Sequence, residues 1–482
     1  MRGSTLGLLS RFLEAGGTIV TTGETPTYLD GGRSRIVERF FEQESIVHCR
    51  PTRAALGKCL AKVSPPAVSI ADARGRNIPA IYAHRRILRG RDLYFLASMD
   101  RERTYRATVT VPDAGEVELW DALTGQVHPL RSRKRGRRRS FELQFPPNAS
   151  YLVTVGKTTK GATPRPAAPK KATRRIELKR SWTHRRLGPN ALVLDFPQHR
   201  FGKGRWGKRR PVHEVQQRAC ERFGIDYDPG NRGTQFWKAY QRMRDMGPEA
   251  RVGLRYEFVS KLSDAAGLRL VVECGDRFEA RVNGKAVAFD GWWRDRSFRT
   301  AEIGHAVKKG ANRVELAIDF RQDVELEASF LIGDFALDKA LALVDEKRTL
   351  RTGDWTRQGY PFYADAMACE QTVALDRVPK AARLCFERLD AIVTRVEVNG
   401  VDAGLVFQQP LQIDVADLLE AGDNQIVVEV YPSLRNLLGP LHNAAEQPRI
   451  TGPWHFFGDW TDDYRLVPYG IAGPVWLETS SP

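Results

Sequence analysis

Two segments of this chain repeat one pattern of apolar residues and turns, and that pattern strongly limits the folds open to it. The first segment reads RFEARVNGKAV and later VKKGANRVELAIDF, and the second reads VTRVEVNGVDAG and later LEAGDNQIVVEVY. In both, alternating apolar residues lead into Asn-Gly, and a Gly-x-Asn turn precedes the next alternating run. Asn and Gly tolerate positive φ, so Asn-Gly between such runs predicts a tight hairpin. The repeat predicts two antiparallel, jelly-roll-like sandwiches, over residues 177–344 and 345–482.

Residues 61–156 predict another, smaller β-sandwich. Short alternating runs such as DLYFLASM, YRATVTV and SYLVTVG are separated by turn residues, among them Arg89-Gly90 and Thr124-Gly125. Residues 157–176 are rich in Lys, Pro, Ala and Thr without hydrophobic periodicity, which is typical of a linker. Residues 198–248 contain two helix-patterned stretches, HEVQQRACERFG and TQFWKAYQRMRDMG, and are interpreted as a helical insertion in the sandwich that follows the linker.

The first segment, residues 1–60, is α/β in pattern. The stretch SRFLEAGG predicts a helix, TIVTTG a short buried strand, and SRIVERFFEQESI a second amphipathic helix. One strand between two helices cannot close a sheet. We therefore expect a truncated α/β segment whose sheet is completed by a missing N-terminal part or by another chain. The expected fold class is mainly β, a multi-domain arrangement of sandwiches with this segment and one helical insertion.

Targeting signals are not visible in the sequence. The opening residues MRGSTLGLLSRFLEAGG lack the continuous apolar stretch and the cleavage site of a signal peptide. No run of about 18 apolar residues predicts a membrane span. The compartment stays open, with the cytoplasm as the default unless the chain has lost its N-terminus. The six scattered cysteines include no CxxC pair, which argues against metal-knuckle and redox motifs.

The net charge of +17 is concentrated in three basic stretches. The densest is RSRKRGRRR, residues 131–139, and the others are residues 157–180 and 199–210. Such runs bind phosphate backbones or acidic polysaccharides by releasing counterions. The simpler interpretation is a solvated hairpin tip and a solvated linker, and nucleic acid is not the expected partner. The residues of the candidate basic patch are Arg133, Arg135, Arg137, Arg138 and Arg139.

Two aromatic clusters are candidate carbohydrate contacts, because sugar rings stack their apolar C–H faces on exposed aromatic rings. The candidates are Trp292, Trp293, Arg294 and Asp295 after the first Asn-Gly turn, and Trp454, Trp460 and Tyr464 near the end of the chain. Adjacent residues on a strand point to opposite faces, so at most one of Trp292 and Trp293 belongs to a core. Sandwich cores also need large aromatic residues, and core packing is the alternative for each candidate.

One acidic cluster is a candidate metal or sugar contact. Asp459, Asp462 and Asp463 lie within five residues, and several carboxylate oxygens together suit Ca²⁺. The alternative is a polar loop between sandwich strands. No cofactor is expected apart from this structural Ca²⁺.

The order of these motifs resembles a known family. Strand, Val-Asn-Gly, spacer, Gly-x-Asn, strand is similar to the sugar-binding jelly roll of glycoside hydrolase family 2 and its galactose-binding-like relatives. HRRILRGRDLYFLASMD, VELWDALTGQVHPL, GPNALVLDF and GDWTRQGYPFYAD resemble parts of large α-L-rhamnosidases of family 106. The opening GGTIVTTGETPTYLD resembles the end of their amidotransferase-like domain.

The resemblance implies a carbohydrate setting and a missing catalytic part. In those families the reaction is expected in an N-terminal (β/α)₈ barrel, and no eightfold strand–helix alternation occurs in this chain. No catalytic residue is therefore assigned, and whether the chain is an enzyme stays open. We expect a non-catalytic accessory region that contacts polysaccharide side chains of plant or microbial origin, with a separate barrel-bearing chain as a further partner. The alternatives are an active glycosidase, alone or with such a partner, and a basic protein that binds acidic glycan or nucleic acid.

Overall fold

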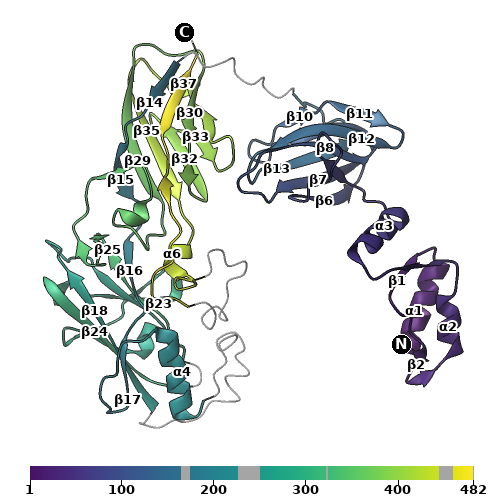
Figure 1. Ribbon diagram of the computed structural model, residues 1–482. Coiled ribbons are helices and arrows are strands. Elements are labelled where there is room, and N and C mark those ends of the chain that lie inside the picture. Colours follow the sequence, from purple (N-terminus) through teal and green to yellow (C-terminus); the bar gives the residue numbers. More distant parts are fainter. Residues whose placement is uncertain (164–173, 226–249, 322–323, 445–459, 481–482) are drawn as a thin grey trace. The chain divides into compact units, whose positions relative to one another are not determined.

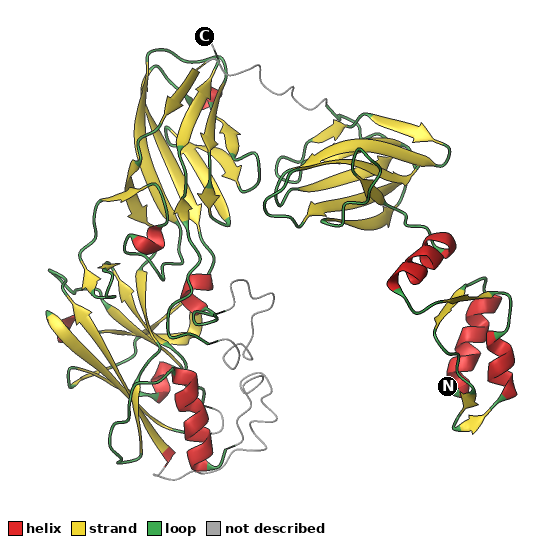
Figure 2. Ribbon diagram, viewed as in Figure 1, coloured by secondary structure: helices red, strands yellow, loops and turns green. Residues whose placement is uncertain are grey.

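The computed structural model describes residues 1–163, 174–225, 250–321, 324–444 and 460–480. It confirms the predicted mainly β, multi-domain sandwich fold (Figures 1 and 2). The chain divides into two compact units, Met1–Ala167 and Ala168–Pro482. No helix among the described residues is long and apolar enough to span a membrane.

The N-terminal segment of the first unit has three more strands and one more helix than the sequence predicts. Its elements are α1 (Gly3–Glu14), β1 (Ile19–Thr22), β2 (Tyr28–Leu29), β3 (Gly32–Arg33), α2 (Arg35–Phe41), β4 (Ile46–Cys49) and α3 (Arg53–Val63). Strand β4 pairs in parallel with β1. The predicted second helix was extended too far, because α2 ends at Phe41 and the chain then turns into β4. A small core of Val37, Phe40, Phe41 and Ile46 holds this segment together.

The rest of the first unit is a sandwich of two antiparallel sheets. One sheet has the order β10-β9-β13-β7-β6 and the other β11-β12-β8-β5. The strands are β5 (Ser69–Ala71), β6 (Ile81–Leu88), β7 (Arg91–Ser98), β8 (Tyr105–Pro112), β9 (Glu116–Trp120), β10 (Val127–Pro129), β11 (Ser132–Arg135), β12 (Arg138–Phe145) and β13 (Ser150–Gly156). Alternate residues of the central strands, such as Tyr94 and Leu96, point into one apolar core.

The second unit contains two sandwiches, and the first is inserted into the sequence of the second. The inserted sandwich contains β16 (Asn190–Leu194), β17 (Gln198–Phe201), α4 (Val212–Phe223), β18 (Arg251–Ser260), β19 (Arg269–Glu273), β20 (Glu279–Val282), β21 (Lys285–Val287), β22 (Gly291–Trp293), β23 (Asp295–Glu302), β24 (Gly310–Asp319), β25 (Ser329–Gly333), β26 (Ala336–Leu337) and β27 (Leu343–Val344). Helix α4 matches the first predicted helix of the insertion, and the second, TQFWKAYQRMRDMG, lies outside the described residues.

The enclosing sandwich begins before residue 190 and ends at the C-terminus. Its main elements are β14 (Arg174–Glu177), β15 (Ser181–Arg186), β28 (Thr349–Arg351), β29 (Met367–Leu375), β30 (Ala382–Phe386), β32 (Val393–Val398), β33 (Val401–Val406), β34 (Gln412–Asp414), β35 (Gly422–Tyr431) and β37 (Val475–Thr479). Because β14 pairs with β37 and β15 with β29, residues 174–186 belong to this sandwich. The predicted boundary at residue 177 therefore left most of β14 in the linker and placed β15 in the other sandwich.

The two sandwiches share the order of their main strands. In the inserted copy the sheets run β21-β20-β24-β18-β27-β26, with β17 also paired to β18, and β16-β25-β19-β23-β22. In the enclosing copy they run β33-β32-β35-β29-β15-β28 and β14-β37-β30-β34. Matching the two orders leaves β22, β26 and β27 of the inserted copy and β28 of the enclosing copy without a counterpart. The sequence repeat thus corresponds to a structural duplication in which β22 is an edge strand that has no equivalent in the described part of the enclosing copy.

The repeated asparagines make the same hydrogen bonds in both copies. The Nδ2 atom of Asn283 donates to Oδ1 of Asn312 over 2.8 Å, and that of Asn399 donates to Oδ1 of Asn424 over 2.9 Å. Each first Asn also donates to a carbonyl oxygen of the 3₁₀ helix that lies between the two asparagines in the chain. Each second Asn bonds in both directions to the backbone four residues earlier. Asn283 and Asn399 have φ near +50°, which Asn adopts more readily than most residues.

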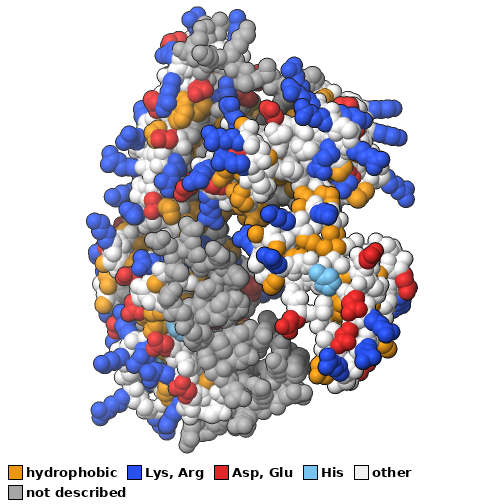
Figure 3. All heavy atoms as spheres, turned by 45° about the vertical axis from the view of Figure 1, so that its right-hand side comes forward, with side chains coloured by type: hydrophobic (Ala, Val, Ile, Leu, Met, Phe, Trp, Pro, Cys, Tyr) orange, Lys and Arg blue, Asp and Glu red, His pale blue; other side chains and the backbone are white. Residues whose placement is uncertain are grey.

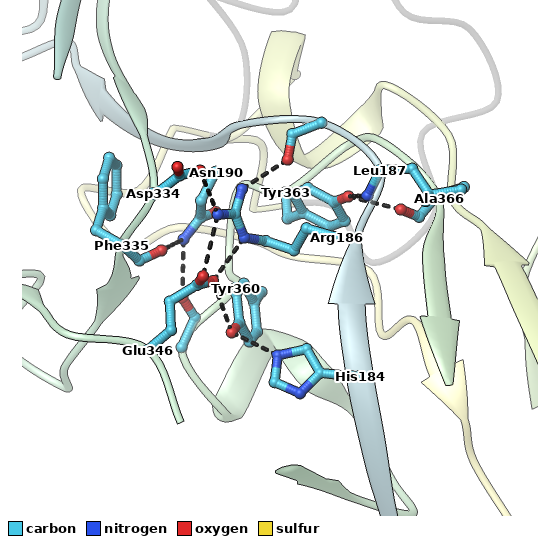
Figure 4. Close-up of polar contacts among 12 residues, drawn as sticks. His184, Arg186, Leu187, Asn190, Asp334, Phe335, Glu346, Tyr360, Tyr363 and Ala366 are labelled. Carbon is cyan, nitrogen blue, oxygen red and sulfur yellow. Dashed lines mark hydrogen bonds and ion pairs between the residues drawn. The ribbon is translucent and has the colours of Figure 1, made fainter. Parts of the chain in front are cut away.

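A polar junction lies where the chain leaves the enclosing sandwich and returns to it (Figure 4). Arg186, at the end of β15, pairs with Glu346 and with Asp334, over 2.5 Å and 2.8 Å. The Tyr360 hydroxyl bonds to Glu346 and to the ring of His184. Burial disfavours the charged guanidinium, but the two carboxylates outweigh it and raise the pKa of Arg186. The junction therefore ties together the outgoing and returning segments.

Candidate carbohydrate-contact site

The added strand β22 presents one tryptophan outward and packs the other. Trp293 lies against the core of the inserted sandwich, with its ring 6.1 Å from that of Phe330. Trp292 is 55% exposed. The strand pairs irregularly with β23 between the two tryptophans, and Arg294 follows with φ of 62°. The prediction that at most one of the pair is a core residue is confirmed.

Two residues that the sequence analysis did not single out lie beside Trp292. Arg299 is its direct partner across the β22–β23 pair, so both side chains point to the same face of the sheet. The Nε atom of Arg299 lies 2.7 Å from a carboxylate oxygen of Asp276, in the 3₁₀ helix Gly275–Arg277. An exposed indole thus stands next to a paired guanidinium and carboxylate. Only the strand register reveals this grouping, which is why spacing along the chain gave no signal for it.

Arg294 and Asp295 shape the turn between the two strands. Arg294 pairs with Asp365 over 2.8 Å, and its guanidinium lies 4.7 Å from the centre of the Trp293 ring. Asp295 accepts hydrogen bonds from the backbone N–H and the hydroxyl of Ser297, both over 2.8 Å, and these bonds lower its pKa. Both residues therefore already have protein partners that fix the position of the tryptophans.

The candidates at the C-terminal end form a second, separate grouping around Asp195, the residue after β16. Tyr464 donates its hydroxyl to Oδ1 of Asp195 over 2.8 Å, and His442 places Nε2 2.9 Å from Oδ2. The Nδ1 atom of His442 lies 2.9 Å from the carbonyl oxygen of Thr461. Both ring nitrogens of His442 therefore lie within hydrogen-bonding distance of oxygen atoms. Burial, with the charge of Asp195, raises the pKa of Tyr464.

Trp460 is enclosed by other rings. It stacks on His442 with a centroid distance of 4.7 Å, and the ring of His213 lies 4.6 Å away. Its Nε1 donates to Asp462 over 2.9 Å. With neighbouring rings on it, this indole offers less free surface to a sugar than Trp292 does.

The predicted Ca²⁺ cluster is only partly described. Trp454 and Asp459 lie outside the described residues. Asp462 accepts from Trp460, and the backbone N–H of Asp463 donates to the hydroxyl of Thr461. In the described part of the chain, no three His, Cys, Asp or Glu side chains are grouped to hold a metal ion. The metal site stays a prediction.

The basic patch of the first unit divides into exposed and engaged arginines. Arg133, Arg135 and Arg137 are exposed on the β11–β12 hairpin. Arg138 donates to the carbonyl oxygens of Ala67 and Thr110, and Arg139 pairs with Asp113 over 2.8 Å. Figure 3 shows Lys and Arg side chains scattered over the visible face with acidic side chains among them. Binding of an acidic partner here stays a prediction.

Carboxyl groups gather at the end of the sheet that carries Trp292. Glu273 is the last residue of β19, and the antiparallel pairing of β19 with β25 brings it close to the start of β25. Glu327 lies two residues before β25 begins. Glu327 is exposed, and desolvation of its carboxyl, with the charges of Glu273 and Glu325, raises its pKa. Burial, with the charge of Glu325, also raises the pKa of Glu273. A carboxyl group protonated near neutral pH can donate a proton.

The fold defines a mainly β, multi-domain sandwich protein in which one sandwich resembles the other. Neither a family model nor a curated protein matches the chain. Among solved structures the chain is similar to a rhamnosidase from Novosphingobium sp. PP1Y. The two sequences are 13% identical, the match covers 99% of this chain and 32% of that chain, and the TM-score is 0.45. It is also similar to an α-L-rhamnosidase from Streptomyces avermitilis, with 13% identity, coverage of 85% of this chain and 35% of that chain, and a TM-score of 0.24. For a β-D-glucuronidase from Dictyoglomus thermophilum the identity is 13%, the coverage is 50% of this chain and 38% of that chain, and the TM-score is 0.19. The chain spans about a third of the length of these structures.

Proposed function

We propose that this chain is a carbohydrate-contacting accessory part of glycoside-hydrolase machinery, with Trp292 as its sugar platform. The observation that carries the proposal is the exposed indole on β22, an edge strand that has no counterpart in the described part of the enclosing sandwich. The enclosing sandwich forms without an equivalent of β22 among its described strands, so the fold does not require an exposed tryptophan at this edge. An exposed aromatic ring beside hydrogen-bonding side chains on such an edge strand suits stacking with a sugar and therefore supports a role in binding.

The neighbours of Trp292 suit a neutral sugar. The apolar C–H face of a sugar ring stacks on the indole, while Arg299 donates to hydroxyl groups and Asp276 accepts from them. Because Arg299 and Asp276 are already paired, the site carries little net charge. The motif order that resembles family 106 makes a rhamnose-bearing polysaccharide of plant or microbial origin the first ligand to test. In this proposal the catalytic barrel belongs to a separate chain.

Affinity electrophoresis in gels containing rhamnose-bearing polysaccharides tests this proposal. We expect the wild-type chain to be retarded and Trp292→Ala to lose at least about tenfold in affinity, since stacking and burial of an aromatic ring contribute about 1.5 kcal/mol or more. Ile392→Ala is the matched control, because Ile392 is similarly exposed at 61% but lies in the enclosing sandwich. Equal retardation of wild type and Trp292→Ala would contradict the proposal.

One observation favours a second candidate function, cleavage of a glycosidic bond. Such cleavage needs a protonated carboxyl group and a second carboxylate, and Glu327, whose pKa is raised by desolvation and by the charges of Glu273 and Glu325, is the candidate for the first. Hydrolysis of aryl rhamnosides and related glycosides by the purified chain tests it. Turnover abolished by Glu327→Gln but retained in Trp292→Ala would replace the accessory role by a catalytic one.

A further inference from the structure

The sandwich of the first unit has one long sheet edge, strand β6, that is left open. Its sheets end at β10 and β6, and at β11 and β5. The turn after β5 covers that edge, since the N–H of Ile78 donates to the carbonyl oxygen of Ile70 over 3.0 Å, and the N–H of Thr163 does the same to Val127 at β10. Strand β11, SRKR, is short and basic, which hinders pairing with another strand. Strand β6 pairs with β7 over eight residues and with no other described strand.

Every second residue of β6 turns its backbone groups away from β7. Antiparallel partners alternate between pairs that exchange hydrogen bonds and pairs that do not. The N–H of Met99 donates to the carbonyl oxygen of Ala80 over 2.8 Å, so the alternation directs the N–H and C=O of Ala83, Arg85 and Ile87 to the open edge. An extended segment of another chain can bond to such groups and continue the sheet.

Apolar side chains surround this edge. Tyr82 and Ile87 on β6 are 64% and 76% exposed, and Phe95 on β7 is 44% exposed. An open groove of about 580 Å³ lies between β6 and the segment around β5. Its apolar lining includes Ala67, Val68, Ile70, Ile78, Ile81 and Ala83. A strand added at β6 places every second side chain on the groove side of the sheet, where apolar side chains fit.

The charges of β6 distinguish between partner strands. Arg85 lies across from the core residue Tyr94 and pairs with Asp92 over 2.6 Å. His84 and Arg86 therefore lie on the opposite, outer face, and both are exposed. Opposite charges on neighbouring strands stabilise a pair and like charges destabilise it. Antiparallel pairing with a second copy, centred on Arg85, brings basic residues together, so a strand with acidic side chains on this face is the better partner.

We propose that β6 binds an extended segment of a partner protein in which apolar and acidic residues alternate. The segment bonds to the outward-facing backbone groups of β6 and becomes a further strand of the sheet. Its apolar side chains cover the groove, and its acidic side chains lie beside His84 and Arg86. This interaction is independent of the sugar site at Trp292, which belongs to the second unit.

Hydrogen–deuterium exchange of the full-length chain, measured by mass spectrometry with the synthetic peptide acetyl-Thr-Val-Glu-Val-Glu-Val-Thr-amide as the probe, tests the proposal. At saturation the peptide should slow exchange over residues 81–88 by about tenfold or more. The same peptide with Lys in place of Glu should bind at least about tenfold more weakly, because its charges repel those of β6. Ala83→Pro should abolish binding of the Glu peptide, since it removes an N–H that faces the edge and leaves the bonds to β7 intact.

Charge reversal on the outer face gives a second test that does not depend on the proline variant folding. Arg86→Glu should reverse the preference, so that the Lys peptide binds more tightly than the Glu peptide. Arg135→Glu is the matched control, because Arg135 is also exposed but lies on β11, another edge strand of the same sandwich. The proposal is overturned if neither peptide protects residues 81–88, if Arg135→Glu changes the preference as much as Arg86→Glu does, or if the wild-type chain alone forms a dimer that protects these residues.

Discussion

Buried asparagine side chains explain at the residue level why the sequence repeats Asn-Gly and Gly-x-Asn together. Asn312 is 2% exposed and Asn424 is fully buried, so their amides depend on protein partners. Those partners are the hairpin asparagine and the backbone of the preceding turn, in the same arrangement in both copies. The two halves of the motif are far apart in sequence but form one hydrogen-bonded corner.

Replacement of Asn424 by alanine should destabilise the second unit by about 2 kcal/mol, because several buried backbone groups and Asn399 lose their partner. Asn312→Ala should have a similar cost, since its network is equivalent. Urea unfolding followed by circular dichroism measures both. Gln425→Ala is the control, because this adjacent side chain is exposed and should change stability by less than about 0.5 kcal/mol. A cost for Asn424→Ala no larger than that of the control would disprove the structural role.

The arginines of the β11–β12 hairpin show that a dense run of basic residues in the sequence does not mean that all of them are exposed and unpaired in the structure. Arg139 is 12% exposed in its side chain and joins β12 to Asp113 and Glu116, whereas Arg133, Arg135 and Arg137 are exposed. The first kind of arginine holds the hairpin against neighbouring strands. The second kind is available to solvent or to an acidic partner.

Replacing Arg139 by Gln should lower the stability of the first unit by about 1 to 3 kcal/mol, because Asp113 keeps little exposure and loses a charged donor. The triple change of Arg133, Arg135 and Arg137 to Gln should leave stability within about 0.5 kcal/mol of wild type. Thermal unfolding of the three proteins at one salt concentration compares them. A larger loss for the triple variant than for Arg139→Gln would contradict this division.

Sequence reasoning succeeded for elements defined by local residues and failed for those defined by distant pairing. The Asn-Gly hairpins, helix α4 and the opposite faces of Trp292 and Trp293 follow from neighbours in the chain. The assignment of β14 to the enclosing sandwich could not be predicted in this way, because it depends on pairing with β37. The sequence of a four-residue strand does not indicate which distant strand it pairs with. The contact of Asp195 with His442 and the pairing of Arg299 with Asp276 were missed for the same reason.

At the scale of the whole molecule, the second unit contains every residue of the proposed sugar site. Trp292, Arg299 and Asp276 all lie within Ala168–Pro482, which forms one compact unit. A protein consisting of residues 168–482 should therefore unfold in a cooperative transition and bind the same polysaccharide as the full chain. Calorimetry and affinity electrophoresis measure the two properties. Cooperative unfolding with loss of binding would show that the first unit contributes to the site.

The insertion of one sandwich within another sets an order of assembly on the ribosome. Strand β14 emerges early, yet its only sheet neighbour in the described structure is β37, at the end of the chain, and Arg174 pairs with Thr479. All strands of the inserted sandwich lie within residues 190–344, so they leave the exit tunnel before the strands that pair with β14 and β15. Nascent domains fold as units once their residues are available. The inserted sandwich should therefore fold first. The contacts of Arg186 with Asp334 and Glu346 join the outgoing and returning segments, and they should keep β14 and β15 close to the position at which β37 later pairs with β14.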